Sequence, residues 1–120
     1  MANPIKGEVP FDVGGRTFTL CLGINAIAEL EAVVDAGVVE IANWFNDRSK
    51  LRAGNMRAVL WAALRKHHPD IDLLAAGDLI QEAGLQVVVV KLGEAIQAAF
   101  PEAEPENPQT QEPGGTGTSS

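Results

Sequence analysis

Residues 8–22, EVPFDVGGRTFTLCL, predict the first element of the fold because two alternating runs flank a pair of glycines. On each side of Gly14-Gly15, every second residue is apolar, which is typical of a half-buried strand. A two-residue Gly-Gly loop suits the tight turns that require positive φ angles. The stretch therefore predicts a β-hairpin over about residues 7–22.

The register of this hairpin agrees with its hydrophobic pattern. A two-residue loop places Phe11 opposite Phe18 and Val9 opposite Leu20, with all four side chains on one face. Pro10 has no N–H to donate to a ladder, so its strand is expected at a sheet edge. Because an isolated hairpin is only marginally stable in water, its apolar face must pack against other elements.

The elements that follow are predicted to be helices. After residue 22, apolar residues recur at three- and four-residue spacing, and polar residues, glycine or proline separate the segments. Asn25 and Asp72 are expected to cap the first and fourth helices. The expected helices cover about residues 25–36, 38–47, 55–68, 72–83 and 85–100, with a polar, basic loop at 47–54. The stripes expected to face the core contain Ile27, Leu30, Val34, Val38, Ile41, Ala42, Phe45, Met56, Val59, Leu60, Ala63, Leu64, Leu85, Val88, Val89, Leu92, Ile96 and Phe100.

The run Val87–Val90 is the ambiguous part of this pattern. Four β-branched residues in succession favour a short strand. The segment from Lys91 to Phe100, however, continues the same helical stripe. We therefore interpret the whole of residues 85–100 as a helix, with a short strand as the competing interpretation.

Together these patterns predict an α+β fold, with an N-terminal β-hairpin packed on a small bundle of four to five α-helices. One domain covers residues 1–100, with the helices at about 25–100. Residues 101–120 hold four prolines, three glycines and four of the sixteen acids, but none of the nine bases. Such a segment buries too little apolar surface to offset its ordering entropy, so it is expected to be a disordered acidic tail.

The charge and hydropathy of the chain argue against several classes of partner. The 120 residues carry a net charge of −7, whereas nucleic-acid binding needs a basic face that replaces phosphate counterions. The apolar runs are far shorter than the roughly 20 residues of a membrane-spanning helix. The first residues lack the apolar core of a secretory signal. We therefore expect no nucleic acid, no membrane and a cytoplasmic location.

Few residues are of the types that form catalytic or metal sites. The cluster His67-His68-Pro69-Asp70 contains ligand-type side chains, but adjacent histidines on a helix point about 100° apart and do not chelate one ion. Cys21 is the single cysteine, which excludes a disulfide framework and a multi-cysteine metal site. It is expected on the polar side of its strand as a simple free thiol. We therefore expect no enzymatic activity, no cofactor and no metal.

Four large apolar residues lie off the predicted core stripes. Trp44 and Trp61 each lie about 100° around their helix from a core position, and Val87 and Val90 flank the stripe of the last helix. Helices in a small bundle pack on two sides, so these residues could simply complete the core. Alternatively, Trp44, Trp61, Val87 and Val90 form an exposed patch that binds another protein.

Five groups of residues follow one another along the first hundred positions. They are Ala2-Asn3-Pro4 with Lys6-Gly7-Glu8-Val9, Gly15-Arg16-Thr17-Phe18-Thr19-Leu20, Asn25-Ala26 with Leu30-Glu31, Leu60-Trp61-Ala62-Ala63-Leu64-Arg65 with His67-His68-Pro69-Asp70, and Ala76-Gly77-Asp78-Leu79-Ile80. This ordered set resembles the tail assembly chaperone-like proteins of gene transfer agents and related tailed phages, a family also labelled tail tube proteins. The resemblance covers about residues 1–100.

The resemblance implies a non-enzymatic role in tail assembly. Chaperones of this kind coat the tape measure protein, keep it soluble and recruit tail tube subunits, and they are absent from the finished particle. The implied partners are therefore the tape measure and tail tube proteins, in the cytoplasm of the bacterial host cell. Whether the chain also associates with itself stays open.

Three alternatives stay open beside this reading. The first is a structural component of the tail or particle, although tail tubes are built from sheets and only two strands are expected here. The second is a cytoplasmic regulator that binds a ligand or a protein. The third is an enzyme that uses His67 or His68.

Overall fold

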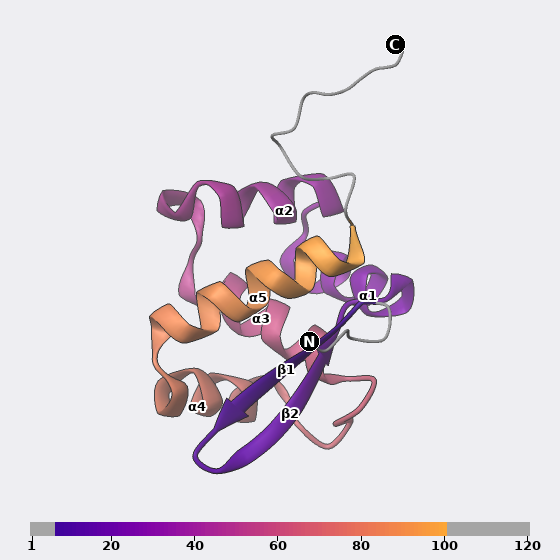
Figure 1. Ribbon diagram of the computed structural model, residues 1–120. Coiled ribbons are helices and arrows are strands. Elements are labelled where there is room, and N and C mark those ends of the chain that lie inside the picture. The colour runs from indigo at the N-terminus through magenta and orange to yellow at the C-terminus, as the bar shows by residue number, and fades with distance from the viewer. Residues whose placement is uncertain (1–6, 101–120) are drawn as a thin grey trace, which may run out of the picture.

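The computed structural model describes residues 7–100 and forms an α+β fold (Figure 1). Within this range the predicted hairpin and helices are confirmed, and a short 3₁₀ helix, η1, is added. The elements are β1 (Glu8–Val13), β2 (Arg16–Cys21), α1 (Ile24–Val34), α2 (Val38–Asn46), η1 (Arg48–Lys50), α3 (Ala53–Leu64), α4 (Leu73–Ala83) and α5 (Leu85–Ala99). The predicted disorder of residues 101–120 lies outside the described residues, as do positions 2–4 and 6 of the family resemblance.

The hairpin has the predicted register. Phe11 pairs with Phe18 in an antiparallel ladder that runs the length of both strands, and both rings are buried. Gly14 and Gly15 form the turn with φ angles of 56° and 82°. These are the positive values that a two-residue hairpin loop requires, so the turn itself sets the pairing.

Pro10 fits into β1 because of its position in the ladder. Successive pairs in an antiparallel ladder alternate between exchanging both backbone hydrogen bonds and exchanging none. Thr19, the partner of Pro10, directs its N–H away from β1 and donates it to Nε2 of His68 at 3.0 Å. Pro10 therefore occupies a pair without ladder hydrogen bonds, where a missing N–H costs nothing.

The ends of α1 differ from the prediction. The helix begins after Gly23 with no side-chain cap, so the prediction that Asn25 caps it is wrong. It ends at Val34 and is followed by Asp35, which has a left-handed φ of 57°. The carboxylate of Glu31 then accepts the N–H of Val38 at 3.0 Å. A side chain of α1 thus caps the first turn of α2, a contact between two helices that local capping rules do not anticipate.

The later helices agree more closely with the prediction. Asp72 caps α4 by accepting the N–H of Ala75 at 2.9 Å. The run Val87–Val90 is helical, as its continuation into the rest of α5 predicted. Helix α3 begins at Ala53, two residues before the expected start at Asn55.

Helix α3 lies at the centre of the core. It packs on α1, α4, α5 and β2. Small residues let these neighbours approach closely, and buried residues occur on most of its faces: Met56, Ala58, Val59, Leu60, Ala62, Ala63 and Leu64. In Figure 1, α5 crosses the middle of the molecule, with α2 on one side and α4 and the hairpin on the other.

The burial of Cys21 and Leu85 is opposite to the prediction. Cys21 is 6% exposed although it alternates away from Phe18 and Leu20. It adjoins the start of α1 and the residues after α3, which cover this end of β2. Leu85, expected in the core, is 56% exposed. It begins α5 at the bend of 117° between α4 and α5, so its side chain lies at the outer corner.

No single helix within residues 7–100 has the length and apolarity that crossing a membrane requires, although α4 and α5 meet that test as a bent pair.

Candidate functional site

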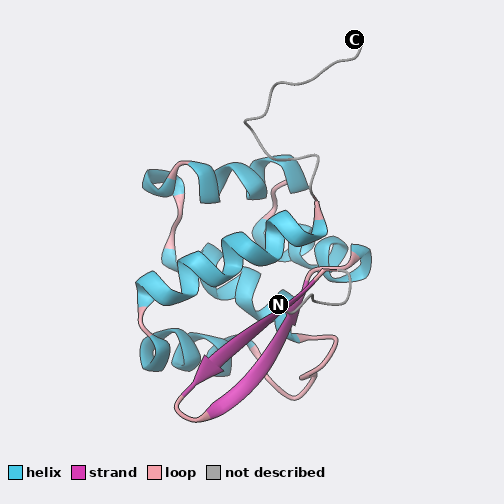
Figure 2. Cartoon of the chain, in the orientation of Figure 1, coloured by secondary structure: helices cyan, strands magenta, loops and turns pink. Residues whose placement is uncertain are grey.

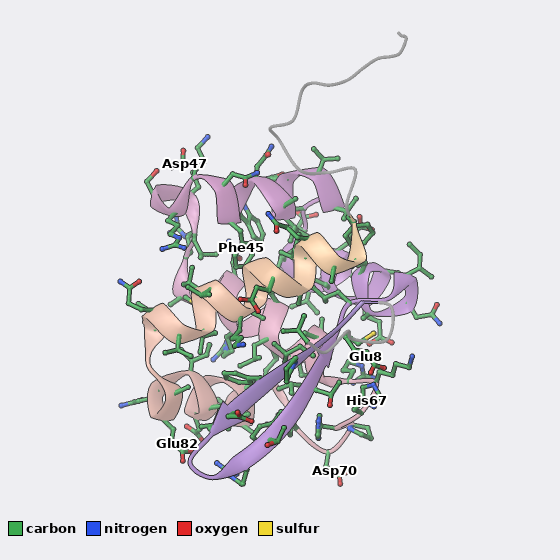
Figure 3. All side chains as sticks on the ribbon, in the orientation of Figure 1. Glu8, Phe45, Asp47, His67, Asp70 and Glu82 are labelled. Carbon is green, nitrogen blue, oxygen red and sulfur yellow. The ribbon has the colours of Figure 1, made fainter. Side chains whose placement is uncertain are left out.

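A groove of about 240 Å³ runs between α2 and α5. The two helices lie side by side (Figure 2). Figure 3 shows Phe45 between them. Apolar side chains from both helices form most of the lining: Ala42, Phe45, Val89, Val90, Ile96 and Phe100. Partly solvated apolar side chains beside a concave surface are typical of a protein-binding site.

The sequence of α5 produces this groove because its apolar residues extend beyond the inward face. Val88, Val89 and Leu92 are buried against the core. Val87 and Val90 are 46% and 47% exposed, although an ordinary surface helix is polar at such positions. Val90 lines the groove, and Val87 lies one turn before it on the same exposed face.

Gly93 keeps the groove open in the middle of α5. A glycine inside a helix costs about 1 kcal/mol relative to alanine. A Cβ atom added at Gly93 would meet no atom within 4 Å, so close packing of this chain does not require the glycine. Because Gly93 lines the groove, a side chain at this position would project into it.

Basic residues follow α2 at one end of the groove. Arg48 lines the groove, and Lys50 and Arg52 are exposed close by in the chain. Within residues 7–100 none of the three forms an ion pair. The hydroxyl and backbone N–H of Ser49 donate to the carboxylate of Asp47 and lower its pKa. Asp47 is thereby held by its own turn, and the segment presents three cations to solvent.

The groove wall formed by α5 carries a more balanced charge. Glu94 lines the groove, and its carboxylate lies 3.6 Å from the ammonium of Lys91 one turn earlier. An exposed pair of this kind contributes little to stability, but it offsets the negative charge of Glu94. Among the described residues that line the groove, Arg48 is therefore the cation.

The two predicted tryptophans lie elsewhere. Trp44 is 6% exposed and belongs to the core, which agrees with the interpretation that it completes the bundle. Trp61 is half-buried, and the Arg65 guanidinium lies over its ring at 5.0 Å. Arg65 is held there by Glu29 at 2.7 Å. Of the four candidate residues, only Val90 lines the α2–α5 groove.

The two histidines have structural partners at the hairpin. His67 Nε2 lies 2.9 Å from a carboxylate oxygen of Glu8, and Figure 3 shows these two side chains close together. His68 accepts the N–H of Thr19 and meets the ring of Phe18 edge-on. No group of three potential metal ligands occurs in the part of the chain that is described. Both histidines therefore connect the end of α3 to the hairpin.

Acidification is expected to destabilise the domain through His68. Burial, with a smaller contribution from His67, lowers the pKa of His68 below 6.5. Above about pH 6.5, the imidazole is neutral in both the folded and the unfolded chain, and its contribution to stability is complete. As the pH falls below about 6.5, the unfolded chain binds a proton at His68 before the folded chain does. The contribution of His68 to stability therefore decreases until the pH has fallen below the lowered pKa of the folded chain.

Denaturant unfolding at about pH 7.5 and about pH 5 checks this expectation. The unmodified chain should have a smaller free energy of unfolding at about pH 5 than at about pH 7.5, because the unfolded chain takes up a proton at His68 before the folded chain does. His68→Gln should lose less, because its side chain does not titrate in this range. An equal loss in both proteins would assign the pH dependence to other groups.

Sequence reasoning did not identify three residues that line the groove. Phe45 and Phe100 were expected in the core, but both are only half-buried, and Arg48 was part of a loop with no assigned role. Their positions in the sequence could have indicated this. Each lies at the end of a helix or just beyond it, where an apolar stripe is less completely covered by neighbouring helices. The pairing of α2 with α5 is not visible in either segment.

Comparison with known proteins identifies one family. The family model described as "Phage tail tube protein, GTA-gp10" matches residues 6–101. This match covers the hairpin and all the helices. Neither the curated proteins nor the solved structures contain a significant match.

Proposed function

We propose that this chain, which belongs to the phage tail tube protein, GTA-gp10 family, acts in tail assembly as a chaperone. Its partners would be the tape measure protein and tail tube subunits, bound before they assemble. The observation that carries this proposal is the α2–α5 groove, an apolar surface on a chain whose described part contains a two-stranded sheet. A tube subunit would instead be expected to contribute larger sheets to a channel wall.

The chemistry of the groove suits a helical client. A long tape measure protein presents apolar stripes that aggregate when they are exposed. The lining of Phe45, Val90 and Phe100 could receive one or two such side chains, and the polar ends would contact solvated residues beside them. Such a contact would bury much less surface than the about 1,200–2,000 Å² that stable interfaces bury. It would therefore be weak and reversible, as a partner that later departs requires.

No catalytic step belongs to this proposal. His67 and His68 have structural partners at the hairpin, and binding to the groove needs neither cofactor nor metal. The proposed location is the cytoplasm of the host cell during particle assembly.

A structural role in the tail is the second candidate function. The description of the matching family as tail tube proteins favours it. It predicts that the chain stays in the finished particle at a fixed ratio to the other tail proteins. The chaperone proposal predicts the opposite.

Affinity capture combined with particle analysis tests both candidates. Tagged protein is recovered from cells that are making particles, and mass spectrometry identifies its partners and the composition of the purified particles. Capture of the tape measure or tube protein, with this chain absent from particles, would support the chaperone. Stoichiometric presence in particles would refute it and support the structural subunit. Absence of both would refute a tail-assembly role.

A further inference from the structure

We propose that residues 101–106, PEAEPE, fold back along the α2–α5 groove and occupy it in the free protein. The segment would act as an internal competitor that a partner must displace. The docking itself is independent of the proposed function, whereas the displacement step rests on it.

The position of the segment is the first argument. Phe100, the last described residue, itself lines the groove. Residue 101 therefore starts at the edge of this surface. Because the connection is intramolecular and short, the effective concentration of the segment at the groove is roughly millimolar. Contacts that would be too weak between separate molecules are sufficient here.

The length of the segment is the second argument. In Figure 1 the C-terminal end of α5, in yellow, and the C-terminal end of α2 lie on opposite sides of the molecule, and the groove between these helices is lined by Phe100 from the first end and by Arg48 from the second. The stretch of α5 between Val89 and Phe100 spans about 16 Å at 1.5 Å per residue. An extended chain advances about 3.3 Å per residue. Five or six residues beyond Phe100 therefore reach the end where Arg48 lies.

The residue pattern of the segment is the third argument. Glutamate and apolar residues alternate through Pro101, Glu102, Ala103, Glu104, Pro105 and Glu106. Side chains of an extended chain alternate between two faces. One face would therefore place small apolar groups against the groove lining, while the carboxylates on the other face lie at the solvated rim of the groove, within reach of the basic residues at its end. The prolines restrict the free segment and reduce the entropy that docking must overcome.

Charge complementarity gives the direction. The segment contains three acids and no base, and the groove ends at Arg48, followed along the chain by Lys50 and Arg52. Glu106 would reach this basic end after crossing the groove. Glu94, the acid in the groove wall, is paired with Lys91 and so opposes the approach only weakly. Exposed charges are screened within about 8–10 Å at physiological salt, so docking should weaken as salt is raised.

Solution NMR of the full chain tests the proposal. In ¹⁵N relaxation measurements, the amides of Glu102, Ala103, Glu104 and Glu106 should give distinctly higher heteronuclear NOE values than the amides of residues 114–120, which lie beyond the segment. Replacing three carboxylates (E102Q, E104Q and E106Q together) should lower the NOE values of the segment's amides toward those of residues 114–120. The same change should shift the amide signals of Arg48, Val90 and Gly93. The hairpin amides should stay in place, and raising the salt concentration should produce the same pattern.

Three outcomes would overturn the proposal. Equal NOE values along residues 101–120, with unshifted groove amides, would leave the groove free for a partner and would not affect the chaperone proposal. Amide shifts confined to another surface would place the segment elsewhere. Groove shifts that disappear on dilution would identify a second copy of the chain as the occupant, because intramolecular docking does not depend on concentration. Glu112→Gln is the matched control, since this acid lies beyond the length of the groove.

Discussion

The Phe11→Ala variant is expected to lose about 3–5 kcal/mol of its free energy of unfolding. Phe11 is 1% exposed, and its ring faces that of Phe18 at 6.2 Å between centroids. It lies on β1, which packs on α5 and α4. Removing the ring leaves a cavity between the hairpin and these helices. Because a domain of this size is stable by only about 5–15 kcal/mol, much of its margin disappears.

Urea unfolding followed by circular dichroism and tryptophan fluorescence measures this loss. Phe100→Ala is the matched control, because it removes the same ring from a half-buried position. We expect that control to cost less than half as much. If Phe11→Ala cost no more than about 0.5 kcal/mol, as an ordinary surface substitution does, the hairpin would not be an integral part of the core.

The Gly93→Leu variant is expected to fold normally and to lose partner capture. A Cβ at this position meets open space, and leucine favours the helix by nearly 1 kcal/mol relative to glycine. The added side chain would occupy part of the 240 Å³ groove and exclude any partner side chain from it. We expect the affinity for the tape measure or tube protein to fall by about tenfold or more, equivalent to about 1.4 kcal/mol.

Gly54→Leu is the control for this variant. Gly54 is also a helical glycine whose added Cβ would meet no atom within 4 Å, but it lies on α3, outside the groove. Capture from cell extracts, together with thermal unfolding of each variant, separates binding from stability. If Gly93→Leu captured partners as well as Gly54→Leu does, the partner would bind another surface.

The prediction from sequence agrees best with the structure where a single local interaction determines the conformation. The glycine turn and the alternation beside it predicted that Phe11 pairs with Phe18, and Asp72 caps α4 as expected. The start of α1 was less predictable: the helix begins after Gly23, and a cap for α2 comes from Glu31 of the preceding helix. Contacts of that kind depend on how two elements meet, which neither segment specifies.

The candidate site shows the same division. Sequence periodicity identified Trp44, Trp61, Val87 and Val90 as apolar residues beyond the core stripes. It did not separate Trp44, which is buried, from Val90, which lines an open groove. The apolar periodicity of a helix indicates at which angle around the helix axis each side chain lies. It does not report which neighbour covers that direction.

By itself, the sequence determined the elements, the hairpin register and the acidic character of residues 101–120, since these follow from short-range spacing and composition. The tertiary structure decided which apolar residues are covered. Cys21 is buried because α1 and the residues after α3 lie over the end of β2, and the groove exists because α2 lies against α5 and leaves Phe45 and Val90 partly open. Burial is a property of packed pairs of elements, and these pairs join residues that are far apart in the chain.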